Sequence, residues 1–297
     1  ITSRLNLLGD ENSTIGVPST WGQKIWDRRF GTSLGENASQ ILALPDGGYL
    51  VVGQNASGSG GDQSEAARGS HDYWAVRLDA SGNKVWDKRF GGSIADQCTS
   101  VAAAPDGGFL IAGYSNSGIS GDRTEGGRGQ ADYWAVKIDA DGNKQWDKRF
   151  GGSGNDLPTS VAVAADGGYV LAGYSNSGAD GDRTEASRGS YDMWVVKIDA
   201  FGNKVWDKRF GGSGSEICHS IIGAPDGGFL LGGRSPSGVE GDKSEASRGS
   251  YDYWVVKINA SGDKVWDKTF GGSDWDECES VVVARDGGFL LAGRSSS

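Results

Sequence analysis

Short apolar runs separated by turn residues dominate the chain, and one copy of the pattern shows how they are arranged. Ser100 to Ala104 is rich in Val and Ala and ends at the turn Asp106-Gly107-Gly108, beyond which Phe109 to Gly113 is again apolar. An Asp-Gly-Gly turn between two apolar runs predicts a β-hairpin, because glycine readily adopts the backbone conformations of tight turns.

A second hairpin is predicted after a long polar loop. Tyr133 to Asp139 alternates in polarity, so that Trp134, Val136 and Ile138 share one face of a strand. An Asp-Gly-Asn turn then leads into Lys144 to Phe150, and no helical pattern is found anywhere in the chain. Four antiparallel strands joined by tight turns are the pattern of one β-propeller blade.

The four-strand pattern recurs at an exact spacing. Five tryptophans lie 60 residues apart without insertion or deletion, at Trp26, Trp86, Trp146, Trp206 and Trp266. They divide the chain into repeats 26–85, 86–145, 146–205 and 206–265 and a partial repeat 266–297, completed by 1–25. Self-similarity at such a period predicts one repeat architecture rather than two domains. We expect a single all-β domain, a five-bladed β-propeller spanning residues 1–297.

The two ends of the chain predict how such a ring closes. Before Trp26 lie 25 residues, and from Trp266 to the end lie 32, which together come close to one further repeat. The C-terminus is expected to supply the two inner strands of the last blade. The N-terminus is expected to supply its outermost strand, Lys24 to Phe30, with Ser3 to Leu8 as a candidate third strand. A blade shared between the ends removes free sheet edges. A sixth blade is expected only if the natural chain is longer.

Composition and charge narrow the function classes. The chain has 51 glycines, 11 tryptophans and one methionine, which suits short strands and tight turns. Its net charge of −10 and pI near 4.8 disfavour a nucleic-acid partner, which needs a basic footprint. No apolar run is long enough to insert into a membrane. The first ten residues lack the pattern of a signal peptide, although a leader already removed would leave the same sequence.

A pattern of three motifs, several positions of which recur in every copy, resembles a known family. The motifs are Phe-Gly-Gly-Ser-x-x-Asp, then Asp-Gly-Gly-Phe-Leu-x-Ala-Gly, then Asp-Tyr-Trp-Val-Val-Lys-Ile-Asp-Ala-x-Gly-Asn. Over residues 26–297 the chain resembles the bacterial β-propeller repeat family known as SBBP. The family name implies seven blades, and this chain departs from it with five. The resemblance implies a secreted or surface setting in bacteria, and it brings no shared catalytic residues.

An acidic residue recurs just before the inner strand of every repeat. Because connections between blades and the long loops open on the same face, these acids lie on the face that carries the loops. One interpretation, which we favour, makes them acceptors for backbone N–H groups of the turn. The other makes them a carboxylate ring at the channel mouth that holds a cation or repels anions. The five residues are Glu36, Asp96, Asp156, Glu216 and Asp276.

The long loop repeats a second charged set. Its carboxylates and glycines are compatible with calcium, which takes six to eight oxygen ligands, but the spacing of a calcium loop is missing and the arginine opposes a cation. We favour an internal arginine–carboxylate pair that orders the loop. The four sets are Asp62, Glu65 and Arg68; Asp122, Glu125 and Arg128; Asp182, Glu185 and Arg188; and Asp242, Glu245 and Arg248.

The repetition breaks at a few positions. His219 stands where other copies have Ser or Thr, and Trp275 stands in the last connection between blades. Trp275 can stack on a sugar ring or pack against the shared blade, and the sequence leaves both open. Cys98, Cys218 and Cys278 occupy one position in their repeats, so we expect small buried residues rather than a disulfide.

These observations favour a non-catalytic binding protein. The sequence contains no nucleophile elbow, histidine-rich metal set or phosphate loop. Near-identical shallow sites suit a repeating polymer and gain avidity from their number, so a glycan bound through the repeated loops is the leading hypothesis. The alternatives are a structural spacer or adhesin module of a larger surface protein, and a glycoside hydrolase acting in the central channel. The expected partners are a glycan or a surface protein, and the expected location is extracellular or on the cell surface.

Overall fold

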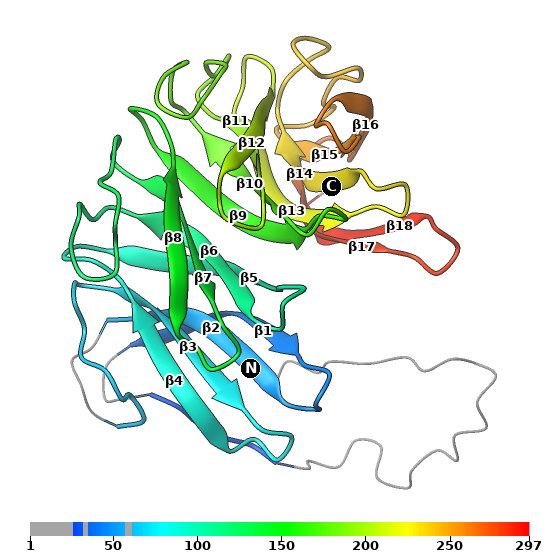
Figure 1. The fold of residues 1–297 in the computed structure, drawn as a ribbon. Helices are drawn as coiled ribbons and strands as arrows, with labels where there is room; N and C mark the ends of the chain where they lie inside the picture. Colours follow the sequence, from blue (N-terminus) through cyan, green and yellow to red (C-terminus); the bar gives the residue numbers. More distant parts are fainter. Residues whose placement is uncertain (1–25, 32–34, 57–60, 297) are drawn as a thin grey trace, which may run out of the picture.

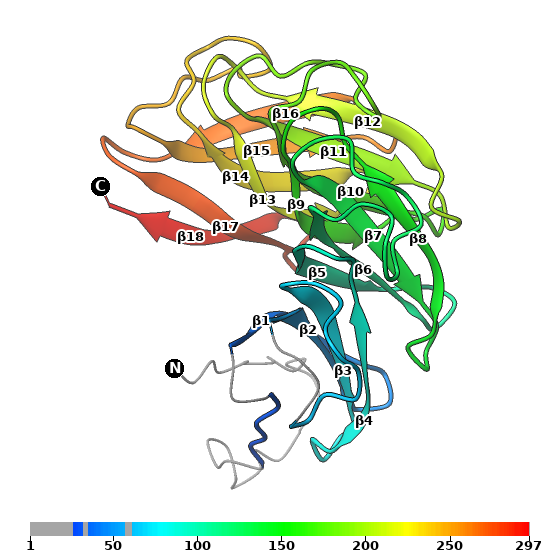
Figure 2. The same ribbon diagram turned by 90° about the vertical axis from the view of Figure 1, so that its left-hand side faces the viewer.

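The computed structural model describes residues 26–31, 35–56 and 61–296, and none of them is helical. These residues form four antiparallel sheets of four strands, each in simple meander order, and one sheet of two strands. The sheets follow one another around an arc in chain order, with β1–β4 at one end and β17–β18 at the other (Figures 1 and 2). The arrangement is propeller-like.

The strands have the same bounds in each repeat to within one residue. They are β1 Glu36–Ala43, β2 Tyr49–Asn55, β3 Asp72–Leu78, β4 Lys84–Phe90, β5 Asp96–Ala103, β6 Phe109–Ser115, β7 Asp132–Ile138, β8 Lys144–Phe150, β9 Asp156–Val163, β10 Tyr169–Ser175, β11 Asp192–Ile198, β12 Lys204–Phe210, β13 Ile217–Gly223, β14 Phe229–Ser235, β15 Asp252–Ile258, β16 Lys264–Phe270, β17 Asp276–Val283 and β18 Phe289–Ser295.

Both predicted turns are confirmed. Gly107 has φ +85° and Gly142 has φ +83°, the left-handed region in which a side chain would be strained. In the first turn the Gly108 N–H also donates to Asp106 Oδ1 at 3.0 Å. This is the role in which aspartate favours tight turns.

The inner strand of each blade is longer than predicted. It begins at Asp96 rather than at Ser100, and its register against β6 shifts between Cys98 and Ser100. Such a β-bulge bends a strand and interrupts the simple alternation of its side chains. The apolar pattern therefore marked only the part of the strand beyond the bulge.

The core lies between successive sheets. Trp134, Val136 and Ile138 are fully buried and share a cluster with Leu50 and Val52 of the preceding sheet. The inner strands of neighbouring sheets also contact one another. The predicted strand face is thus the surface through which one blade packs on the next. Burial of an indole and two branched aliphatic side chains stabilises such a junction by several kcal/mol, at about 25 cal/mol per Å² of apolar surface.

Closure of the ring is not part of the described structure. β17 and β18 form a two-stranded sheet, and residues 26–31 have no strand pairing of their own. The candidate third strand, Ser3 to Leu8, and the first two residues of Lys24 to Phe30 lie outside the described residues. Among the residues that are described, no helix has the length and apolar character needed to cross a bilayer.

Candidate functional site

The recurring acids before the inner strands are buried and hydrogen-bonded. Asp156 Oδ2 accepts the Gly152 N–H at 2.8 Å and the Ser177 hydroxyl at 2.8 Å, and Ser175 also donates to this carboxylate. Glu216 repeats the arrangement one blade later, since it accepts Gly212 N–H at 2.9 Å. This is the geometry of an acceptor that holds the turn. The side chains of four of the five acids are at most 2% exposed, namely Asp96, Asp156, Glu216 and Asp276, whereas Glu36 is half-buried.

Burial also changes the titration of these acids. Burial raises the pKa of Asp96 and of Asp156 above the ordinary value of 3.8, although hydrogen bonds from the glycine N–H and the two serines act in the opposite direction. The carboxylate oxygens are directed at donors of their own connection and loop. The carboxylate of Asp156 is therefore buried and held by donors of the scaffold itself.

The arginine of each long loop reaches the next blade. Arg128 lies 2.7 Å from Asp182 Oδ2, and the same pairing occurs between Arg68 and Asp122 at 3.1 Å. Asp182 Oδ2 also accepts the N–H of Gly151 in the connection between blades at 3.2 Å. Each of these aspartates thus links its own loop to the connection between two blades and to the arginine of the preceding loop. Arg188 pairs with Asp242 in the same way, and Arg248 donates to the Gly271 carbonyl.

The glutamates of the loops pair mostly with the outer strands. Glu125 lies 3.2 Å from Lys148, Glu185 lies 2.6 Å from Arg209, and Glu245 lies 2.6 Å from Lys268. In the first loop Glu65 pairs with Arg68 at 3.3 Å, the internal pair that the sequence favoured, and also lies 3.9 Å from Lys88 of the outer strand. Within the described part of the chain, no three His, Cys, Asp or Glu side chains come together as a set of metal ligands.

A further buried carboxylate was missed at the sequence level. Asp147 in the outer strand accepts hydrogen bonds from the Trp134 indole at 3.1 Å, the Thr124 N–H at 3.0 Å and Lys144 at 2.9 Å. Burial opposes the charge of Asp147, but these bonds outweigh it, so its pKa lies below the ordinary value. The recurring Trp-Asp-Lys of the outer strand was the available signal. The same position in the other repeats is Asp87, Asp207 and Asp267.

The break in the repeat at Trp275 belongs to a cluster of aromatic and charged side chains. The Trp275 and Tyr251 rings lie 4.5 Å apart between centroids, and the Arg234 guanidinium lies over both rings, 4.5 and 4.8 Å from their centroids. Glu277 accepts the Trp275 indole N–H at 3.2 Å and Arg234 at 2.8 Å. His219 Nε2 also lies 2.6 Å from Glu277. The two interruptions of the repeat, His219 and Trp275, thus meet at one carboxylate.

The cysteines line the inner part of the junctions between blades. Cys98, Cys218 and Cys278 are free and buried, and no disulfide joins the last two. Burial raises the pKa of the Cys218 thiol to about 12, so that it stays protonated at neutral pH. A buried thiol of this kind is inert.

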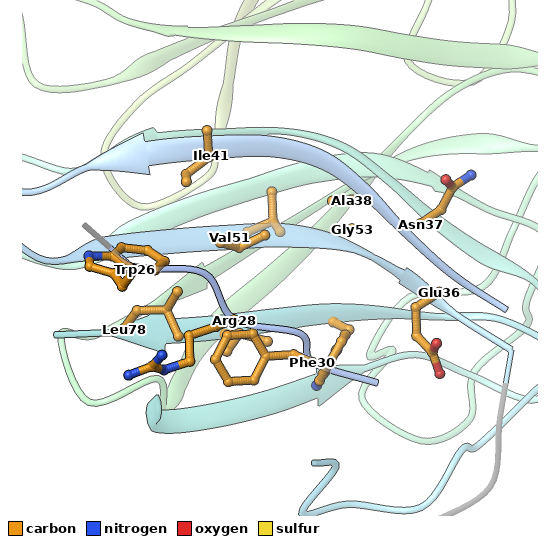
Figure 3. Close-up of a pocket in the computed structure, with 13 residues that line it drawn as sticks. Trp26, Arg28, Phe30, Glu36, Asn37, Ala38, Ile41, Val51, Gly53 and Leu78 are labelled. Carbon is orange, nitrogen blue, oxygen red and sulfur yellow. The ribbon is translucent and has the colours of Figure 1, made fainter. Parts of the chain in front are cut away.

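An apolar cleft lies at the open face of the first sheet. It has a volume of about 330 Å³ and is bordered by Trp26, Arg28 and Phe30 on one side and by strands β1–β3 on the other (Figure 3). Ile41 and Val51 project into this region from β1 and β2. At every other described junction the corresponding surface is covered by the preceding blade.

Comparison with known proteins gives distant likenesses. No family model matches the chain. Regulatory protein FlaEY of Caulobacter vibrioides is 25% identical over an alignment of 216 residues, and the match covers 69% of this chain and 22% of that protein. The chain thus spans about a fifth of this relative's length.

Two solved structures align with most of the chain. A protein of unknown function from Bacteroides caccae covers 82% of this chain and 87% of its own length, with a TM-score of 0.41 and 12% identity. An apocarotenoid oxygenase of Synechocystis covers 80% of this chain and 51% of its own length, with a TM-score of 0.41 and 14% identity. Neither likeness bears on activity.

Proposed function

We propose that the chain closes into a five-bladed β-propeller in which β17–β18 and the N-terminal residues form one blade. Trp26 supports this, because a Cβ on Gly82 would lie 2.7 Å from the Trp26 ring. Trp86 has the same relation to Gly142 of the next blade, where the distance is 3.2 Å. This likeness supports Trp26 as part of the outermost strand of a preceding blade.

Phe30 agrees with this assignment. It packs against Trp74, Val76 and Leu78 of the first sheet. Phe90 packs in the corresponding way on the Trp134 face of the second sheet. These contacts support residues 26–31 as the outer strand of the proposed closing blade.

The two open faces match the two sides of an internal junction. Ile41 is 54% exposed, whereas Ile221 at the same repeat position is 3% exposed. Leu290 is 63% exposed at the other end of the arc, whereas its equivalent Leu230 is fully buried. Because Leu230 packs on the β17–β18 sheet, the same contact carried one repeat further places Leu290 against Ile41. The occupant of the cleft in Figure 3 is then the β17–β18 sheet of the same chain.

We further propose that this propeller is a non-catalytic binding module whose ligand is a glycan. One observation carries the proposal. The repeated charged groups of the loop face are engaged within the scaffold, while aromatic and amide side chains remain partly exposed at the junctions between blades on that face, among them Tyr174, Tyr191 and Asn155. Aromatic faces and amides are suited to the C–H groups and hydroxyls of sugars. They are not an acid and base pair of a hydrolase, which needs two accessible carboxylates.

Immobilised polysaccharides test this function directly. We expect the native chain to bind a subset of glycans on a broad array and to release no reducing sugar from any of them. Binding should persist in EDTA, because the loop carboxylates already have protein partners. Absence of binding across the array would contradict the proposal, as would turnover that Asp156→Asn abolishes.

The second candidate is a structural spacer of a longer surface protein. The extensive pairing of loop charges across junctions favours it, because such pairs stiffen the scaffold without presenting a ligand. An outcome in which no glycan binds, but the chain stays monomeric and rigid, would favour the spacer. A bacterial secreted or surface location, and membership of the SBBP repeat family, remain part of the proposal on the strength of the three repeat motifs.

A further inference from the structure

A band of partly exposed aromatic side chains crosses three successive junctions on the loop face. Tyr114, Tyr174 and Arg234 hold the same position in β6, β10 and β14, the second strands of consecutive sheets. Tyr191 and Tyr251 hold another shared position, where the long loop bridges to the next connection. We call the following set the aromatic band: Tyr114, Tyr174, Tyr191, Arg234, Tyr251 and Trp275.

The rings of the aromatic band are ordered by direct contacts. Tyr174 and Tyr191 meet edge to face with centroids 5.4 Å apart. At the next junction Tyr251 and Trp275 lie 4.5 Å apart with Arg234 over both. The pKa of Tyr174 is raised first by its burial and then by Tyr114 and Tyr191.

The band is a deviation from the repeat rather than a part of it. The first junction carries Gln54, His71 and Ala95 at the positions where the last junction carries Arg234, Tyr251 and Trp275. The framework of these junctions is otherwise almost unchanged in sequence. Aromatic rings are therefore not needed to hold a junction together, and their gathering at one end of the arc needs another explanation.

We propose that the aromatic band is a binding strip for a neutral hexopyranose chain; this inference rests on the glycan-binding function proposed above. The apolar faces of sugar rings stack on exposed aromatic rings. The band extends over consecutive blades, which suits an oligosaccharide better than a single sugar. The amides of Gln130 and Asn155, which contact each other at 3.3 Å beside the band, provide donors and acceptors for hydroxyl groups.

The charges of the site select against acidic sugars. Arg234 is neutralised by Glu277 at 2.8 Å, so that its guanidinium is not a free anion site. The chain as a whole carries a net charge of −10, which repels polyanions at low ionic strength. A neutral polymer has no such barrier.

Affinity gel electrophoresis tests the inference with defined probes. Laminarin, mannan and galactan serve as neutral polysaccharides, and alginate and polygalacturonate as acidic ones. The variants are Trp275→Ala and Tyr174→Ala, which remove rings from two separate junctions. Phe201→Ser is the control, because Phe201 is 76% exposed in the turn between β11 and β12, at the opposite end of the sheet. Near-ultraviolet circular dichroism verifies that each variant is folded.

The outcomes separate the inference from the function on which it rests. We expect the native chain and Phe201→Ser to bind at least one neutral polysaccharide, and each ring deletion to weaken binding by about threefold to tenfold. Unchanged binding by both folded band variants would overturn the aromatic band while leaving a glycan-binding function in place. Binding to acidic probes alone would overturn the neutral ligand. Absence of binding to any probe would overturn both proposals.

Discussion

The hydroxyl of Tyr133 donates a hydrogen bond to the backbone carbonyl of Trp194, 2.9 Å away in the next blade. Tyr73 makes the same bond to Trp134 at 3.0 Å. Both tyrosines are fully buried, so each bond gives a partner to a hydroxyl group that water does not reach. One blade is thereby fixed against the backbone of the next.

Removing this hydroxyl should weaken the fold. Tyr133→Phe removes the buried hydrogen bond to the Trp194 carbonyl, so we expect the free energy of unfolding to fall by about 1–2 kcal/mol in urea titrations. The next repeat has Met193 at this position. Met193→Leu is therefore the matched control and should change stability by less than about 1.5 kcal/mol. An effect of Tyr133→Phe no larger than a few tenths of a kcal/mol would contradict the role given to the bond.

Substitution of Asp147 should reduce the stability of the fold more than substitution of most other polar residues. Asp147→Ala leaves the Trp134 indole, the Thr124 N–H and Lys144 without their shared acceptor, and we expect it to reduce stability by about 3–5 kcal/mol. Because the folded-state pKa is lowered, the contribution of Asp147 is present above the ordinary value of 3.8 and is lost as pH falls through the folded pKa. Unfolding of native protein and of Asp147→Asn from pH 7 to pH 2 measures this; parallel curves would contradict it.

The pair of Arg128 and Asp182 should contribute less than its regularity suggests. Its side chains are 39% and 21% exposed, so solvent screens the attraction. A double-mutant cycle should give a coupling below about 1 kcal/mol, reduced further in 1 M salt. Asp182→Ala alone should be more harmful than Arg128→Ala, because Asp182 also accepts the Gly151 N–H. Equal effects of the two single substitutions would be evidence against this distinction.

His219 should make the free energy of unfolding depend on pH in the mildly acidic range. Burial lowers its pKa below 6.5, although Glu277 and Glu279 act in the opposite direction and Arg234 reinforces the shift. The stability that neutral His219 provides is present above about pH 6.5 and is lost as pH falls through the folded pKa. His219→Thr places the residue of another repeat there. The stability of native protein relative to this variant should decrease between pH 7 and pH 5; a constant difference would refute the assignment.

The sequence predicted what depends on local geometry. The turns at Gly107 and Gly142 follow from backbone conformations available to glycine, and the shared face of Trp134, Val136 and Ile138 follows from strand alternation. Both features need only neighbouring residues. The bulge after Cys98 was not foreseen, because it interrupts the alternation of side chains from which a strand is recognised.

Contacts between blades could not be predicted from the sequence. Arg128 is paired with an aspartate in the following loop, and nothing in a single repeat distinguishes that partner from Glu125 in its own loop. Likewise His219 and Trp275 were noticed separately as breaks in the repeat. Their meeting at Glu277 depends on how the fourth and fifth blades stack.

Ring closure is the central claim, and an internal junction supplies a template for testing it. A Cβ on Gly232 would lie 3.0 Å from Sγ of Cys278 in the next blade, a separation compatible with a disulfide. Ala292 holds the position of Gly232 in the last blade, and Ala38 holds the position of Cys278 in the first. In a closed ring, Ala38→Cys and Ala292→Cys should therefore face each other. Ala172→Cys with native Cys218, which share one core cluster, is the matched internal control.

The decisive measurement is oxidation of Ala38→Cys/Ala292→Cys in a background with the three native cysteines replaced by serine, followed by mass spectrometry of the linked peptides; the control protein carries Ala172→Cys and keeps Cys218, with Cys98 and Cys278 replaced by serine. We predict an intramolecular disulfide in monomeric protein, formed to the same extent as in the control. If the control pair oxidises while Cys at 38 and 292 stay reduced, or link only different molecules, the ring is open and the account is wrong.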